Sequence, residues 1–186
     1  MANQALLVMD MQNGIVERYA DKVEPLLGTL GAALVAARAK AMTVIFVRVA
    51  FREGAPEASA KNKSFAALAG SPAMDETSYA TQIHERLAPL AGELLVTKRR
   101  VSAFAGSDLD VVLRTKGIDT LVLSGIATSG VVLSTLREAA DLDFDLTVLS
   151  DGCADADPEV HRVLTEKVFV RQANVLTTQE WIKQLT

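Results

Sequence analysis

The sequence predicts a three-layer α/β/α fold of the doubly wound, Rossmann-like kind, with a six-stranded parallel sheet between two layers of helices. Two observations predict it. First, short and continuous apolar runs recur along the chain. Such runs are typical of parallel strands buried on both faces, whereas half-buried strands alternate apolar and polar residues. Second, segments of helical spacing separate these runs, and strand–helix alternation favours an open parallel sheet.

Six apolar runs are the predicted strands, and helix signals follow several of them. The strands are expected at residues 5–9, 43–49, 93–97, 120–124, 146–150 and 174–176. Asp157 followed by Pro158 is an N-cap with a first-turn proline, and Thr177 with Glu180 forms a capping-box pattern. We assume the strand order 3-2-1-4-5-6, the common one for this architecture.

Length and composition bound the class of protein. The 186 residues fit one domain over 1–186, and the charged fraction of 23% is ordinary for a globular chain. A net charge of −4 makes nucleic acid a poor partner. A lone cysteine excludes an intrachain disulfide and fits a reducing compartment. Without a signal peptide or an apolar run long enough to span a membrane, the chain is expected to be cytoplasmic and not membrane-bound.

A ligand site is expected where the strand order reverses, between the first and fourth strands. Ligands of open parallel sheets bind beyond the carboxyl ends of the strands at this point. Asp10 follows the first strand, and the fourth runs directly into the segment 125–135, GIATSGVVLST. The N–H groups at the start of the next helix would favour an anion or a developing oxyanion, although a tight turn without a ligand is the alternative. The segment 51–92 breaks the alternation and is expected to be a functional loop.

No cofactor or metal is predicted. Neither glycine-rich nucleotide fingerprint occurs, and no serine-centred nucleophile elbow is present. His84 and His161 are far apart and lack acidic residues at ligand spacing, so both are expected to be surface helix residues rather than metal ligands. A small-molecule substrate remains the expected partner.

Several segments together resemble the isochorismatase-like hydrolase family, which includes nicotinamidases and N-carbamoylsarcosine amidases. The matching pieces are ALLVMDMQNGI, VRVAFREGAPE, VTKRRVSAF, LVLSGIATSGVVLSTLREAADLDF and LTVLSDGCAD, which span almost the whole chain in order. The resemblance implies the isochorismatase-like hydrolase fold. It also implies a homo-oligomer, since members of the family are often assembled from identical chains.

The family triad maps onto this chain with one departure. The resemblance places the catalytic aspartate at Asp10, the lysine at Lys98 and the nucleophilic cysteine at Val131. Valine cannot attack a carbonyl, so the thiol mechanism is not supported. Isochorismatases also lack the cysteine, but they carry a histidine where Ser129 stands, so the chain departs from both branches. The aspartate-and-histidine metal pattern of nicotinamidases has no counterpart.

The resemblance also implies a ligand loop made of Ala127, Thr128, Ser129 and Gly130. A non-proline cis peptide is expected between Ile126 and Ala127, and it would turn the amides of Ala127 and Val131 into an oxyanion hole. Thr128 and Ser129 are disfavoured as substitute nucleophiles because no suitable base is evident beside them.

Three questions stay open at the level of sequence. An ammonium beside Asp10 would lower its pKa and favour a base, whereas burial would raise it and favour an acid. Cys153, in SDGCAD after the fifth strand, is expected to pack in a turn rather than react. Finally, the chain is either a hydrolase of a small polar metabolite that uses Asp10 and Lys98, or a catalytically inactive relative that binds a metabolite or a partner.

Overall fold

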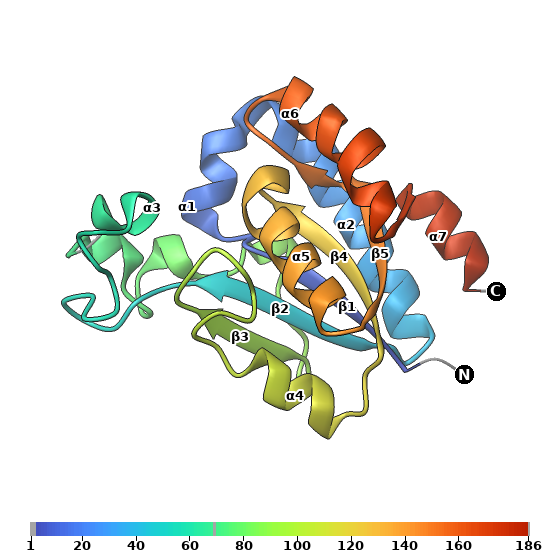
Figure 1. Ribbon diagram of the computed structural model, residues 1–186, viewed down its shortest axis with the longest axis horizontal. Helices are drawn as coiled ribbons and strands as arrows, with labels where there is room; N and C mark the ends of the chain where they lie inside the picture. The colour runs from blue at the N-terminus through green and yellow to red at the C-terminus, as the bar shows by residue number, and fades with distance from the viewer. Residues whose placement is uncertain (1–2, 69, 186) are drawn as a thin grey trace.

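The computed structural model describes residues 3–68 and 70–185 and contains a six-stranded, all-parallel sheet (Figure 1). The strand order is β3-β2-β1-β4-β5-β6, which confirms the predicted fold class and order. The strands are β1 (Gln4–Met9), β2 (Thr43–Val49), β3 (Leu94–Lys98), β4 (Thr120–Ile126), β5 (Asp145–Ala154) and β6 (Asn174–Leu176). All six begin within one residue of the predicted start, while β4 extends two residues and β5 four residues further than predicted.

Helices cover both faces of the sheet, with α5 in front and α2 behind in Figure 1. They are α1 (Asn13–Val16), α2 (Ala20–Ala39), α3 (Lys63–Ala66), α4 (Leu109–Thr115), α5 (Leu133–Asp141), α6 (Pro158–Val163) and α7 (Thr178–Gln184). The predicted N-terminal signals are confirmed for the last two. The Asp157 side chain accepts from the N–H groups of two residues in the first turn of α6, and Thr177 with Glu180 forms a capping box on α7.

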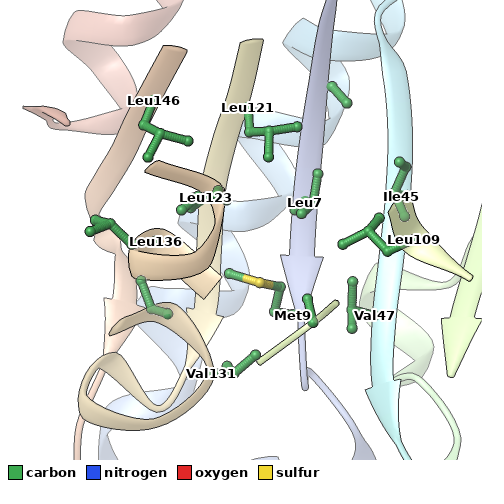
Figure 2. Close-up of a cluster of buried hydrophobic side chains, with 14 of the residues drawn as sticks. Leu7, Met9, Ile45, Val47, Leu109, Leu121, Leu123, Val131, Leu136 and Leu146 are labelled. Atoms are coloured by element: carbon green, nitrogen blue, oxygen red, sulfur yellow. The ribbon is translucent and has the colours of Figure 1, made fainter. Parts of the chain in front are cut away.

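The core is divided by the sheet into two apolar layers, because successive strand residues point to opposite faces. Leu7, Ile45 and Leu123 belong to the layer under α4 and α5, which Figure 2 shows. Their neighbours Val8 and Phe46 belong to the other layer, under α2 and α7. Since both layers are fully buried, the strands need continuous apolar runs, which is the pattern that predicted them.

A buried glutamine helps to attach the long segment 51–92 to the sheet. Gln12 is 1% exposed and follows β1 closely. Its Nε2 donates to the carbonyl oxygens of Val49 (2.9 Å) and Thr81 (3.2 Å), while its Oε1 accepts from the N–H of Val49 (2.8 Å). The segment carries α3 and the short 3₁₀ turns η2 (Pro72–Met74), η3 (Tyr79–Thr81) and η4 (Glu85–Leu87). It is therefore a folded insertion rather than an open loop.

Candidate functional site at the ends of β1, β3 and β4

The end of β1 places a carboxylate at the edge of the sheet. Asp10 directly follows Met9, and its φ of +55° lies in the left-handed region, which aspartate enters more readily than most residues. Its N–H donates to the carbonyl oxygen of Val47 at 2.8 Å, so the turn is tied to β2. The backbone therefore fixes where the Asp10 side chain begins.

Lys98, the last residue of β3, reaches this carboxylate. Its Nζ lies 2.9 Å from Asp10 Oδ2 and donates to the carbonyl oxygen of Arg100 at 3.0 Å. Lys98 is 2% exposed and Asp10 is 5% exposed, so the ion pair is buried. Asp10 Oδ1 has no hydrogen-bond partner among the described residues. Because an unpaired buried oxygen is costly, this atom is available to a bound molecule or a proton.

The protonation of Asp10 is set by two opposing effects. Burial raises its pKa, and the charge and hydrogen bond of Lys98 offset that rise only in part. The pKa of Asp10 is therefore higher than the ordinary value of an aspartate. Of the two effects that the sequence left in competition, burial is the larger.

The segment after β4 forms the third side of the site. The peptide bond between Ile126 and Ala127 is cis. A single π-helical turn, η5 (Thr128–Val132), follows and leads into α5. The Ala127 carbonyl oxygen accepts from the N–H groups of Gly130 (3.1 Å) and Val132 (3.3 Å), which closes the turn. We refer to residues 126–132 as the β4 loop.

Val131 points its side chain into apolar surroundings. It is 2% exposed and belongs to the same buried cluster as Met9 and Val47 (Figure 2). An isopropyl group offers neither a nucleophile nor a hydrogen-bonding atom, so this position contributes packing and its backbone amide.

Comparisons with known proteins identify the family. A model of the isochorismatase domain matches residues 4–180. The chain belongs to the isochorismatase family. Ureidoacrylate amidohydrolase RutB of Stutzerimonas stutzeri (strain A1501) is 34% identical over 97% of this chain and 79% of that protein. The crystal structure of N-carbamoylsarcosine amidase from Thermoplasma acidophilum has a TM-score of 0.78 at 26% identity, covering 96% of this chain and 97% of that one.

The fold likeness extends to cysteine hydrolases. A cysteine hydrolase from Pseudomonas syringae pv. phaseolicola 1448A has a TM-score of 0.89 at 24% identity, covering 98% of this chain and 92% of that chain. At that identity the comparison shows the fold alone. The isochorismatase family is one of hydrolases, which supports a hydrolase here, and this member has valine where the family resemblance expects cysteine.

The one thiol of this isochorismatase-family chain lies elsewhere. Cys153 is on β5, opposite Gly125 of β4, and is 6% exposed. Burial raises the pKa of its thiol to about 12. At neutral pH the thiol stays protonated and is a poor nucleophile, as expected, but Cys153 lies within a strand rather than in the expected turn, because β5 continues to Ala154.

Sequence reasoning missed two residues that hold the β4 loop from the side of β5. His161 of α6 is half-buried rather than a surface residue, and its Nδ1 lies 2.8 Å from Thr128 Oγ1. The expectation that no base stands beside Thr128 is therefore wrong. Asp155 Oδ2 accepts the N–H of Ser129 at 2.7 Å. The sequence offered only weak indications of these two roles. Asp155 directly follows the end of a strand, and His161 lies one turn into a capped helix.

Thr128 is nevertheless a poor candidate nucleophile, because it is 0% exposed. Its hydroxyl is occupied by the imidazole of His161, and a substrate carbonyl cannot approach a fully buried oxygen without opening the loop. The contact is better described as a support for the β4 loop. Burial lowers the pKa of His161, with the charge of Asp155 opposing, so the ring is neutral near pH 7.

The ion pair is covered by the surrounding protein, since Asp10 and Lys98 are both buried. Neither Asp10 nor Lys98 nor Val131 lines any of four cavities recorded along residues 3–68 and 70–185. Within the same part of the chain, no three His, Cys, Asp or Glu side chains gather so that they would hold a metal ion. No helix formed by those residues has the length and apolar character needed to cross a bilayer.

Proposed function

We propose that this protein hydrolyses a small polar metabolite without a cysteine nucleophile, with Asp10 as the acid–base group and Lys98 as the residue that positions it. The observation that carries the proposal is the buried 2.9 Å contact between Lys98 Nζ and Asp10 Oδ2, with no partner for Asp10 Oδ1 among the residues that the structure describes. A buried charged pair with a free oxygen at a switch point of a parallel sheet is typical of a functional site.

The proposed chemistry needs one proton carrier. Asp10 accepts a proton from the attacking water and returns it to the leaving group, so no bond to the protein forms. The backbone N–H groups of Ala127 and Val131 donate to the oxygen that gains negative charge, while Thr128, Ser129 and Gly130 shape the turn. A raised pKa suits this double role, because a carboxyl that titrates closer to neutral pH serves as both base and acid.

The names of relatives supply the first substrates to test. One is a ureidoacrylate amidohydrolase and another an N-carbamoylsarcosine amidase. We therefore propose that the scissile bond is a ureido or carbamoyl C–N bond, with a vinyl ether as the second choice because isochorismatases, which belong to this family and also lack the cysteine, act on a vinyl ether.

A second candidate function is metabolite or partner binding without catalysis. The specific observation in its favour is the closed surface: Val131 is 2% exposed within an apolar cluster and fills the position of the family nucleophile. A protein that had lost catalysis would retain the buried ion pair for its structural role alone.

Activity measurements on matched variants distinguish the two candidates. The wild-type protein, Asp10→Asn and a control, Asp141→Asn at the exposed end of α5, are screened against carbamoyl amino acids, ureidoacrylate and vinyl ethers. Hydrolysis by the wild type and the control, with a loss of about 100-fold or more in Asp10→Asn, supports the hydrolase. If the wild type and both variants are inert while a compound still raises the melting temperature, binding without catalysis replaces hydrolysis as the proposed function.

A gain-of-function variant gives an independent test of the β4 loop. Val131→Cys places a thiol at the position of the family nucleophile with little change in side-chain volume. Appearance of amidase activity in this variant would show that Asp10, Lys98 and the loop amides are arranged for hydrolysis. Inactivity of this variant towards every amide in the panel, with an unchanged melting temperature, would count against that arrangement.

A further inference from the structure

The β4 loop has a second neighbour, a cavity on the side of β5. It has a volume of about 310 Å³, within the range of small-ligand sites. Three elements form it: the first half of α2, the end of β5, and the start of α6. The lining residues are Pro25, Leu26, Thr29, Asp151, Cys153, Ala154, Asp155, Pro158 and His161. Because β5 and β1 flank β4 on opposite sides, this cavity and the Asp10–Lys98 pair lie to either side of the loop.

The cavity combines an apolar body with negative charge. Carbon-rich side chains such as Leu26, Pro25 and Pro158 make up much of the lining. The two charged groups in the lining are Asp151 and Asp155, and no described lysine or arginine is among the lining residues. A carboxylate or phosphate ligand would be repelled there, whereas an ammonium group would be attracted.

Asp155 is the more unusual of the two carboxylates. It is 8% exposed, and its oxygens accept N–H groups of the backbone, from Ser129 at 2.7 Å and from Asp157 at 3.4 Å. Its charge acts on its surroundings: it contributes to raising the pKa of Tyr19 and opposes the lowering of the pKa of His161. Buried carboxylates are usually paired with a cation, and neutral N–H donors are the partners that the described residues provide here.

We propose that this cavity is a second ligand site, separate from Asp10 and Lys98, which takes a small apolar molecule bearing a protonated amine. The ammonium pairs with Asp155 at the wall, and the apolar part fills the space against α2. The site goes beyond the proposed hydrolysis and does not depend on it.

Occupancy of this site would be felt by the β4 loop. The Asp155 carboxylate that attracts the amine also accepts the N–H of Ser129, and His161 in the same lining contacts Thr128 at 2.8 Å. An ammonium that shares Asp155 Oδ2 weakens its hydrogen bond to Ser129. Two consecutive residues of the loop are therefore connected to the cavity by side chains, without a change of fold.

Binding of three matched probes tests the proposal on the full-length protein. Benzylamine, benzyl alcohol and benzoate have the same ring and differ in charge. At pH 7, we expect benzylamine to raise the melting temperature and to bind about tenfold more tightly than benzyl alcohol in calorimetry, since a charge-assisted hydrogen bond exceeds a neutral one by that order. Benzoate should not bind. Equal affinity for amine and alcohol, or no binding of any probe, would overturn the ligand class.

Three variants locate the binding. Asp155→Asn should abolish the preference for the amine, and Thr29→Leu, which adds bulk to the lining from α2, should abolish binding of all probes. The control Asp145→Asn removes an exposed carboxylate from the opposite end of β5 and should bind benzylamine like the wild type. Thr29→Leu leaves the Asp155 hydrogen bonds in place, so the proposal stays testable if Asp155→Asn does not fold. Undiminished benzylamine binding in Thr29→Leu would place the amine elsewhere.

Nuclear magnetic resonance can test whether ligand binding in the cavity affects the β4 loop. Benzylamine should shift the Ser129 amide resonance with the same titration curve that calorimetry gives, because the hydrogen bond to Asp155 weakens. If saturating benzylamine does not shift this resonance, the cavity is not connected to the β4 loop, although it can still be a ligand site.

Discussion

The β4 loop lies between two polar sites that handle a buried carboxylate in different ways. On the β1 side, Asp10 is paired with the ammonium of Lys98, and no recorded cavity among the described residues reaches it. On the β5 side, Asp155 is held by backbone N–H groups and lines a cavity. The comparison teaches that a buried carboxylate can be satisfied either by an ammonium or by neutral N–H groups, and that only the second arrangement leaves its charge without a partner of opposite sign among the described residues.

The largest expected effect on stability comes from adding a methyl group to a glycine, and it should differ between Gly125 of β4 and Gly152 of β5. A Cβ on Gly125 would lie 2.0 Å from the carbonyl oxygen of Met9, and φ there is +128°. A Cβ on Gly152 of β5 would lie 2.9 Å from the Cβ of Leu149, at a φ without strain. We expect Gly125→Ala to destabilise the protein by about 5 kcal/mol or more, and Gly152→Ala by about 1–2 kcal/mol. Urea denaturation measures both, and similar losses would contradict the difference in packing.

Breaking the ion pair should have the next largest effect. Lys98→Met leaves the Asp10 carboxylate uncompensated in a buried site, and we expect a loss of about 3 kcal/mol at pH 7. The loss should shrink at low pH, where Asp10 is protonated in the folded and unfolded chains alike. The double variant Asp10→Asn, Lys98→Met should be more stable than Lys98→Met alone. A double variant that is less stable than both single variants would contradict this account of the pair.

On the β5 side the expected effects are smaller, because the contacts are neutral hydrogen bonds. Thr128→Val removes a hydroxyl that is 0% exposed and keeps the side-chain shape, so we expect a loss of about 1 kcal/mol. A double-mutant cycle with His161→Leu should give a coupling energy of similar size, measured by urea denaturation. Additive losses, with no coupling, would show that the 2.8 Å contact does not support the loop.

The smallest expected effect is a pH dependence from His161. Burial lowers its pKa in the folded protein, so the unfolded chain binds a proton more readily. Its contribution to stability is therefore complete above about pH 6.5, the ordinary pKa of histidine, and is lost as the pH falls below that value through the lower pKa of the folded protein. Measured at pH 7.5 and 5.5, the wild type should lose more stability than His161→Gln does. An equal loss of stability in the two proteins would mean that groups other than His161 cause the pH dependence.

Sequence patterns predicted the fold more fully than the site. The strand runs were recognisable because a buried parallel strand needs continuous apolar residues, and these are neighbours along the chain. Errors arose at ends: the last four residues of β5 include Asp151 and Gly152, which read as a turn although the sheet continues through them. Asp10 and Lys98 were grouped by the family resemblance rather than by a local pattern, and the structure joins them at 2.9 Å.

The sequence by itself determined the parallel sheet and the family, because each depends on residue types in a local order. Tertiary structure decided that burial outweighs Lys98 in setting the pKa of Asp10, that His161 meets Thr128, and that Asp155 lines a cavity. The physical reason is that desolvation and side-chain contact depend on how distant segments pack. Thr128 and His161 are 33 positions apart, and no local pattern specifies that contact.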